Sequence, residues 1–136
     1  SLNSNEAGYF WSNKGHYAVC VLRGDLKRNF ERFLLEILEE IPKVRALYTI
    51  LSFRDVRYID PFLVPLLIQC QSGLRDKGVL KVCGVSKEWK EMLMRAGGLR
   101  NEEICVDIPH AINEIITIKR KMNKKSDDII FGKKNG

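Results

Sequence analysis

Two stretches of sequence decide the fold class of this chain: Ala46–Phe53, ALYTILSF, and Pro61–Lys77, PFLVPLLIQCQSGLRDK. The first is a continuous apolar and β-prone run, the pattern of a strand covered on both faces of a sheet. The second places apolar residues at helical spacing, at Leu63, Leu66, Leu67, Cys70 and Leu74. Because a helix that follows a buried strand makes a crossover connection, we expect an α/β fold with mainly parallel strands.

Upstream of this stretch, the sequence predicts a β-hairpin and an amphipathic helix. Asn13–Gly15 is a turn signal between two β-prone runs, Tyr9–Trp11 and His16–Leu22. Gly24 is expected to end the second strand. Apolar residues then recur at steps of three and four over Phe30–Ile41, with charged residues between them, which indicates a helix with one buried face.

Downstream, strands and helices continue to alternate. Gly78 is expected to end the second helix as a left-handed cap, before a short apolar strand over Val79–Val85. A helix capped by Ser86 follows as far as Arg95, then a strand over Glu103–Val106 and a last helix over Pro109–Met122. The order predicts a mixed, mainly parallel sheet of four to five strands, flanked by four helices.

Length and charge place limits on the organisation of the chain. Its 136 residues fit one domain, with residues 1–8 expected as an extension or tag remnant, 9–118 as the domain and 119–136 as a basic tail. No apolar run approaches the roughly 20 residues needed to cross a bilayer. We therefore expect a cytoplasmic protein, or a soluble piece of a larger one.

The net charge of +6 is concentrated at the carboxyl end, where seven Lys and Arg residues oppose only Asp127 and Asp128 after residue 118. Such a tail can bind nucleic acid or an acidic membrane surface through its charge. It can equally be a solvated, disordered end. Because no aromatic residues alternate with the lysines, we favour the solvated tail, with no specific nucleic-acid partner and no direct membrane insertion.

Catalysis and metal binding have little support in the sequence. The four cysteines lie in apolar stretches without a CxxC pair, and both histidines are isolated: Cys20, Cys70, Cys83, Cys105, His16 and His110. Small buried cysteines in a reducing compartment account for this pattern better than a zinc site does. No serine has a partnered histidine for nucleophilic work. We expect no enzyme activity, no metal and no cofactor.

Several short motifs follow one another along this sequence in a characteristic order. They are Val21-Leu-Arg-Gly-Asp-Leu26, the strand and bend Thr49–Asp60, Leu74-Arg-Asp-Lys-Gly78, Gly84-Val-Ser86 and Met92–Leu99. In this order and spacing, the region from Tyr17 to Ile116 resembles the STAS domains of bacterial anti-sigma factor antagonists. The resemblance implies the same small α/β fold and a function in protein–protein docking.

In the signalling members of that family, a serine directly after the Asp of the bend is phosphorylated by an anti-sigma kinase, and this breaks the complex. Here the matching position is Pro61, followed by Phe62, with Leu63 in place of the family glycine. Lys27 occupies the position where those members carry an acidic residue in the early loop. Of the residues around the phosphorylation site, only Asp60 therefore remains. We expect no phosphorylation at this motif.

The resemblance also indicates where a partner protein would dock. The expected surface is the start of the second helix with the loops beside it: Asp25, Lys27, Arg57, Tyr58, Asp60, Pro61, Phe62 and Val64. From local chemistry alone, Asp60 is a helix N-cap and Pro61 suits the first helical position. Pro65 forfeits a hydrogen bond one turn in, so we expect either a distorted first turn or a regular helix that starts near Pro65. Since Leu63, Leu66 and Leu67 supply the buried stripe, Phe62 or Val64 is expected to point outward.

Three functions remain open at this stage. The leading interpretation is an antagonist-like module that regulates transcription or signalling by docking a kinase-like anti-sigma factor, without the serine switch. The second is a STAS subunit or domain of a membrane transport system, either an ABC-type lipid transporter or an anion transporter. The third is a STAS domain that binds a small ligand, such as a nucleotide or a lipid carrier. A homodimer is compatible with each.

Overall fold

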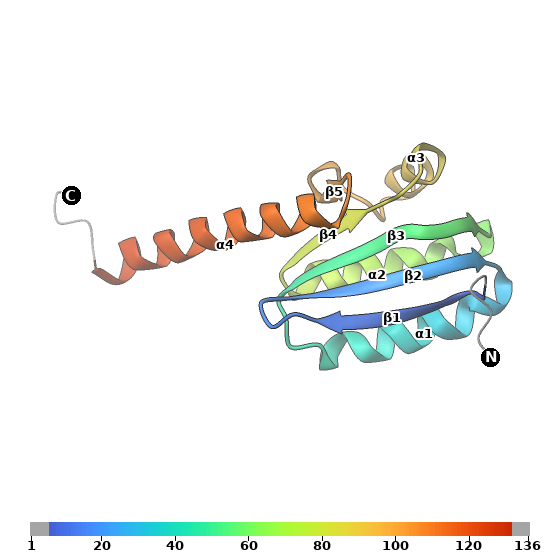
Figure 1. The fold of residues 1–136 in the computed structure, drawn as a ribbon, viewed down its shortest axis with the longest axis horizontal. Helices are drawn as coiled ribbons and strands as arrows, with labels where there is room; N and C mark the ends of the chain where they lie inside the picture. The colour runs from blue at the N-terminus through green and yellow to red at the C-terminus, as the bar shows by residue number, and fades with distance from the viewer. Residues whose placement is uncertain (1–5, 132–136) are drawn as a thin grey trace.

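A computed structural model describes residues 6–131 and contains a single five-stranded sheet (Figure 1). Neighbouring strands in the sheet follow each other in the same order as in the chain: β1 (Gly8–Asn13), β2 (Tyr17–Leu26), β3 (Tyr48–Ile59), β4 (Val79–Cys83) and β5 (Ile104–Cys105). β1 pairs antiparallel with β2, and every other pair is parallel. This confirms the mixed, mainly parallel sheet that the sequence predicts.

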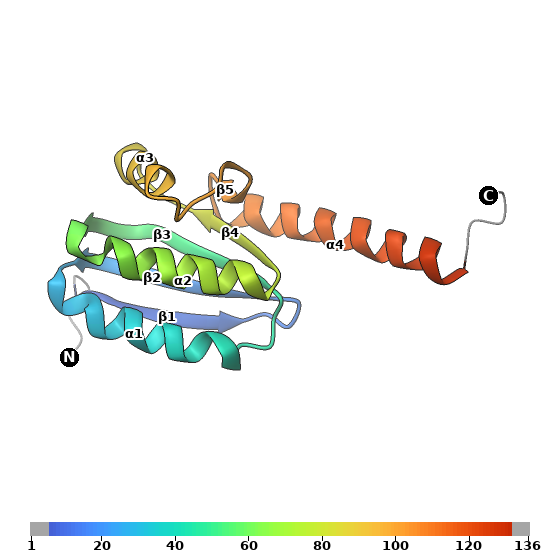
Figure 2. The ribbon, with the colours of Figure 1, turned by 180° about the vertical axis from the view of Figure 1, so that it is seen from behind.

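Within the described residues, four α-helices accompany the sheet: α1 (Glu31–Glu40), α2 (Val64–Lys77), α3 (Lys87–Arg95) and α4 (Ile108–Phe131). Figure 2 shows α1 and α2 side by side across one face of the sheet, where α1 and α2 side chains share a core with Leu51 and Val82. On the other face, Ala111 and Ile115 of α4 pack against Ile50. The two cores account for the apolar, continuous pattern of β3, because it is covered on both sides.

β2 and β3 are longer than expected. β2 continues through Gly24 to Leu26, and β3 continues past Phe53 to Ile59, where a loop was predicted. The two extensions pair with each other, whereas β4 pairs only with the first part of β3. Gly24 lies in an irregularity of this ladder with φ of +87°, and a Cβ there would come 2.7 Å from the Cα of Ala7. The glycine therefore bends the strand instead of ending it.

Gly78 ends α2 for a different reason than expected. Its φ of 165° is extended backbone, so the expected left-handed cap is absent. A Cβ on Gly78 would lie 2.3 Å from the carbonyl oxygen of Leu47. That oxygen accepts a hydrogen bond from the amide of Val79 at 2.9 Å, where β4 begins. A glycine is needed here because the chain entering β3 passes too close for a side chain.

α4 is longer than the sequence predicts, because it runs to Phe131 and not to Met122. Beyond Lys119 every described side chain is exposed, up to Ile130, and Figures 1 and 2 show this part projecting away from the sheet. The last contacts with the body are made by Lys119, which meets the ring of His16, and Met122, whose sulfur lies 3.7 Å from the Tyr48 hydroxyl. The boundary of a separate tail at residue 119 therefore falls inside a continuous helix and stays a proposal.

We expect that deleting residues 124–136 leaves the fold intact, because the described side chains in this stretch are exposed and the Tyr48–Met122 contact is retained. Removal of exposed residues changes stability by about 0.5 kcal/mol or less, which corresponds to a change in melting temperature of about 3 °C at most. Thermal unfolding followed by circular dichroism measures this. As a positive control, Ile115→Ala creates a cavity under the buried part of α4 and costs about 3 kcal/mol. A truncation that destabilised as strongly as Ile115→Ala would show that the tail packs on the body.

Candidate functional site

The extended ends of β2 and β3 bring the residues of the expected docking surface together. Asp25 is the register partner of Tyr58, and the amide of Asp60 donates to the carbonyl of Leu26 at 2.8 Å. The Arg57 guanidinium lies 3.4 Å from the Asp25 carboxylate, with both side chains substantially exposed. An exposed ion pair adds little stability, so its main effect is to orient Arg57. We call this region the strand-end surface, formed by Arg28, Arg57, Tyr58, Phe62 and Trp89.

The entry into α2 follows the local chemistry expected of Asp60, Pro61 and Pro65. The Asp60 carboxylate accepts a hydrogen bond from the amide of Phe62 at 2.9 Å, which is an N-cap. Pro61–Leu63 form a 3₁₀ turn, and the regular α-helix begins only at Val64 with Pro65 as its second residue. The first turn is therefore not regular α-helix, and the regular helix starts next to Pro65, in agreement with the prediction.

Phe62 points outward, as predicted, while Leu63 is fully buried beneath it. The Phe62 side chain is 43% exposed, and the guanidinium carbon of Arg28 lies 4.1 Å from its ring centroid. A cation at this distance over an aromatic face is attracted to the ring and holds it in place. Pro61 and Lys27 are exposed nearby, whereas Val64 is only partly exposed and packs against the core.

Tyr58 and Trp89 form the second aromatic part of the strand-end surface. Their rings meet edge to face, with centroids 6.0 Å apart, and Tyr58 is 42% exposed. Trp89 comes from the first turn of α3, where the Ser86 hydroxyl accepts a weak hydrogen bond from its amide at 3.4 Å. Trp89, Arg57 and Val56 also line a hollow of about 280 Å³ at the carboxyl ends of β3 and β4. This is near the lower end of pockets that hold drug-sized ligands, so the hollow fits a single protruding side chain.

The sequence does not reveal two members of this surface. Arg28 belongs to a 3₁₀ turn between β2 and α1, and its approach to Phe62 joins segments far apart in the chain. Trp89 is partly buried and packs against the core. Nothing in its spacing predicts the additional contact with Tyr58.

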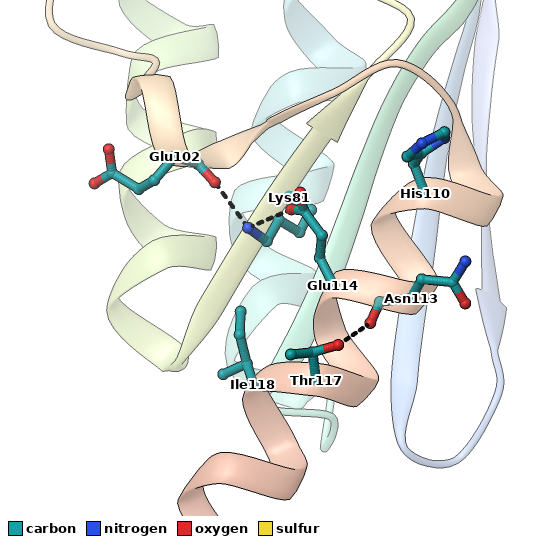
Figure 3. A pocket seen from close by; sticks show the side chains of 7 residues that line it. All are labelled: Lys81, Glu102, His110, Asn113, Glu114, Thr117 and Ile118. Carbon is teal, nitrogen blue, oxygen red and sulfur yellow. Dashed lines mark hydrogen bonds and ion pairs between the residues drawn. The ribbon is translucent and has the colours of Figure 1, made fainter.

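A larger hollow, of about 440 Å³, lies beside α4 and is lined by Lys81, Glu114 and His110 among others (Figure 3). Lys81 is 7% exposed, donates to the Glu102 carbonyl at 2.7 Å and pairs with the Glu114 carboxylate at 2.8 Å. Glu114 also accepts from the Cys105 thiol at 3.2 Å, and Lys81 and this thiol hold the pKa of the carboxyl below its usual range. Because these groups satisfy one another, we interpret the cluster as a link between α4 and the sheet.

The cysteines are buried as expected and carry no disulfide. Burial raises the pKa of the Cys70 and Cys105 thiols to about 12 and that of Cys20 further still, so none of these three is a thiolate at neutral pH. Among residues 6–131, no cluster of three or more His, Cys, Asp or Glu side chains is placed to hold a metal ion. Within the same range, no helix is long and apolar enough to span a bilayer.

Comparison with known proteins identifies the fold. No family model matches the sequence, and no curated protein matches it. Among solved structures, a variant of RsbS from Moorella thermoacetica superposes with a TM-score of 0.68 and 16% identity, over 82% of this chain and 97% of that one. The phosphorylated Bacillus cell fate determinant SpoIIAA gives 0.63 and 16%, over 79% and 99%.

A third similar structure comes from a protein of the sulfate transporter family from Wolinella succinogenes. It superposes with a TM-score of 0.65 and 21% identity, over 80% of this chain and 92% of that one. These structures share the architecture of anti-sigma factor antagonists and of transporter STAS domains. The chain therefore has the STAS fold, as the motifs implied.

Proposed function

We propose that this chain is a protein-docking module similar to anti-sigma factor antagonists, which binds its partner through the strand-end surface. The observation that carries this proposal is the pair of exposed aromatic side chains, Phe62 and Tyr58, each 42–43% exposed at the ends of adjacent elements. Exposed aromatic groups beside cations are typical of interface hot spots, because they bury a large area with few rotatable bonds. Arg28 and Arg57 would supply the charged rim.

We further propose that docking is not regulated by phosphorylation at the start of α2. Pro61 has no hydroxyl group, and none of the residues from Asp60 to Val64 offers one. In addition, the Asp60 carboxylate already occupies the amide of Phe62 at the helix entry. A phosphate would otherwise be favoured at such a helix start. In the solved structures, SpoIIAA is described in both phosphorylated and unphosphorylated forms, so this chain would differ from it in this respect.

A second candidate function is a regulatory module of a membrane transport system. It is favoured by the similarity to the sulfate transporter family protein, at 21% identity. Both candidates use the fold to bind another protein, and they differ in the partner. A kinase-like anti-sigma factor supports the first candidate, and a membrane permease supports the second.

The substitution Phe62→Asp is expected to weaken partner binding at least tenfold, because an aromatic anchor contributes about 2 kcal/mol or more to an interface. Stability is expected to change little, since the ring is 43% exposed and a carboxylate is tolerated at a helix start. Partners are captured from native lysate, identified by mass spectrometry, purified and titrated against each variant by calorimetry. Thermal unfolding of each variant is measured in parallel.

The matched control is Phe10→Asp on β1. Phe10 is 52% exposed and lies on the outer strand, away from the strand-end surface. The Phe10→Asp variant is expected to bind the purified partner as tightly as the parent chain does. Equal loss of binding in both variants would remove the support for this surface. A loss of several kcal/mol of stability in Phe62→Asp, without a specific binding defect, would show that Phe62 is a core residue.

A further inference from the structure

The projecting part of α4, residues 119–130, continues the apolar stripe that holds the helix on the sheet. Ile108, Ile115, Met122 and Ile129 follow at intervals of seven residues, so they lie on nearly one line of the helix. Ile115 is buried against the sheet, but Met122 is 54% exposed and Ile129 is 73% exposed. Ile130 widens the stripe and is 72% exposed. We call residues 119–130 the arm.

Basic residues flank this exposed stripe on both sides, with Lys119 on one side and Lys125 on the other. Lys125 lies three residues after Met122 and four before Ile129, so it is beside the stripe on the helix surface. Of the two acidic residues of the arm, Asp127 lies on the far side of the helix from Met122 and Ile129, and Asp128 lies at the flank of the stripe. Residues 119–136 contain seven basic and two acidic residues, a net charge of +5, whereas the whole chain carries +6. Within residues 119–130 alone, five basic and two acidic residues give a net charge of +3, so the exposed apolar stripe belongs to a basic helix.

Three other uses of the arm explain fewer of these observations. A solvated tail needs neither a helix nor aligned apolar residues. Nucleic acid would pair with the lysines but leave Met122 and Ile129 uncovered, and the described part of the arm has no aromatic residue for base stacking. Pairing with the same arm of a second copy would cover the stripe, but it would also bring two strongly basic helices into contact.

An anionic lipid surface uses both the stripe and the charge. A helix of this kind lies in the interface, with its apolar side chains at the boundary of the acyl chains and its lysines extended to the headgroups. Each basic residue near an anionic surface contributes about 1 kcal/mol. The folded body anchors the first half of the helix through Ala111 and Ile115, so the arm is helical before it binds.

We propose that the arm adsorbs to membranes containing anionic lipids and holds the folded body beside them. The arm leaves the body at the amino-terminal end of β3, where Met122 meets Tyr48. The strand-end surface lies at the opposite, carboxyl-terminal end of the same strand. A partner protein can therefore bind while the arm is on the membrane, and the two properties can be tested separately.

The test is cosedimentation of the full chain with vesicles, either of phosphatidylcholine alone or with about one third phosphatidylglycerol. Binding is expected only to the anionic vesicles, and it is expected to weaken as salt is raised. Replacing Arg120, Lys121, Lys124 and Lys125 by Gln is expected to reduce the partition coefficient about a hundredfold or more. The matched control replaces four basic residues of the body, Lys43, Lys87, Lys90 and Arg95, by Gln, and it is expected to bind normally.

A second variant tests the apolar contribution. Met122→Ser with Ile129→Ser keeps the charge and is expected to lower anionic-vesicle binding at least about tenfold. Unchanged binding in this variant, equal loss in the body control, or no binding to either vesicle would overturn the proposal. Absence of vesicle binding together with self-association that the Ser variant abolishes would assign the arm to a second copy. Phe62→Asp is expected to bind vesicles normally, so a failed docking surface and a failed arm give different results.

Discussion

Replacing Glu103 by Ala is expected to lower the free energy of unfolding by about 3–5 kcal/mol, because it leaves a buried guanidinium without its partner. Arg75 donates to Glu103 through Nε at 2.5 Å and through Nη2 at 2.8 Å. The two side chains are 12% and 6% exposed, so water cannot replace the carboxylate easily. Glu103 also accepts from the backbone amide of Arg100 at 3.0 Å, and this bond is lost as well.

Urea denaturation monitored by circular dichroism measures the loss. Glu102→Ala is the matched control, since Glu102 is the exposed neighbour in the same 3₁₀ turn, Asn101–Glu103. It is expected to stay within about 0.5 kcal/mol of the parent chain. A loss below about 1 kcal/mol for Glu103→Ala would indicate that solvent reaches Arg75, contrary to its burial.

This ion pair gives a physical reason for two of the motifs that carried the family resemblance. Arg75 belongs to the motif that ends α2, and its Nη2 also donates to the carbonyl of Gly98 at 3.0 Å, within the motif that follows α3. Gly98 itself has no room for a side chain, because a Cβ would meet Gln71 and Ile68 at 2.6 Å. Both motifs therefore hold α2 against the segment that leads to β5, and they stabilise the fold without contributing to the strand-end surface.

Periodicity predicted the core of the fold because burial and hydrophobic pattern coincide there. β3 is an example, where the apolar run up to Phe53 is the part covered by helices on both faces. The prediction failed beyond Phe53, since Arg54 and Asp55 break the apolar pattern while their strand still pairs with β2. Backbone pairing of an exposed ribbon leaves little trace in residue type. The helical arm was missed for a similar reason, because most of its residues are polar.

The candidate site was predictable only in its local part. The cap by Asp60 and the outward direction of Phe62 follow from residues within one helical turn. The contacts of Arg28 with Phe62 and of Trp89 with Tyr58 depend on how distant segments meet, which a single sequence does not contain. The additional length of β2 and β3 has the same origin, and it is what places Asp25 opposite Tyr58.

The second large effect is expected for Gly78→Ala, because the space around this residue leaves no room for a side chain. The φ of 165° at Gly78 lies outside the left-handed region, so we derive the expected effect from that lack of space. The new Cβ would lie 2.3 Å from the oxygen and 3.1 Å from the carbonyl carbon of Leu47. Both are backbone atoms at the start of the β3–β4 ladder, and they cannot rotate away as the end of a side chain could. We expect a loss of about 3 kcal/mol, the upper part of the range for overpacked sites.

Substitutions at two other glycines distinguish the effect of limited space on stability from the effect of backbone conformation. Gly15 has φ of +85° with open space around it, so Gly15→Ala is expected to cost about 1 kcal/mol from backbone strain alone. Gly8 lies in β1 with open space and without a positive φ, so Gly8→Ala is expected to be neutral or slightly stabilising. Urea denaturation of the three variants is expected to rank Gly78→Ala as the most destabilising, followed by Gly15→Ala. If Gly78→Ala proved as mild as Gly8→Ala, the close approach of Leu47 to the end of α2 would be wrong. The register of β4 against β3 would then have to be revised, since it begins at this contact.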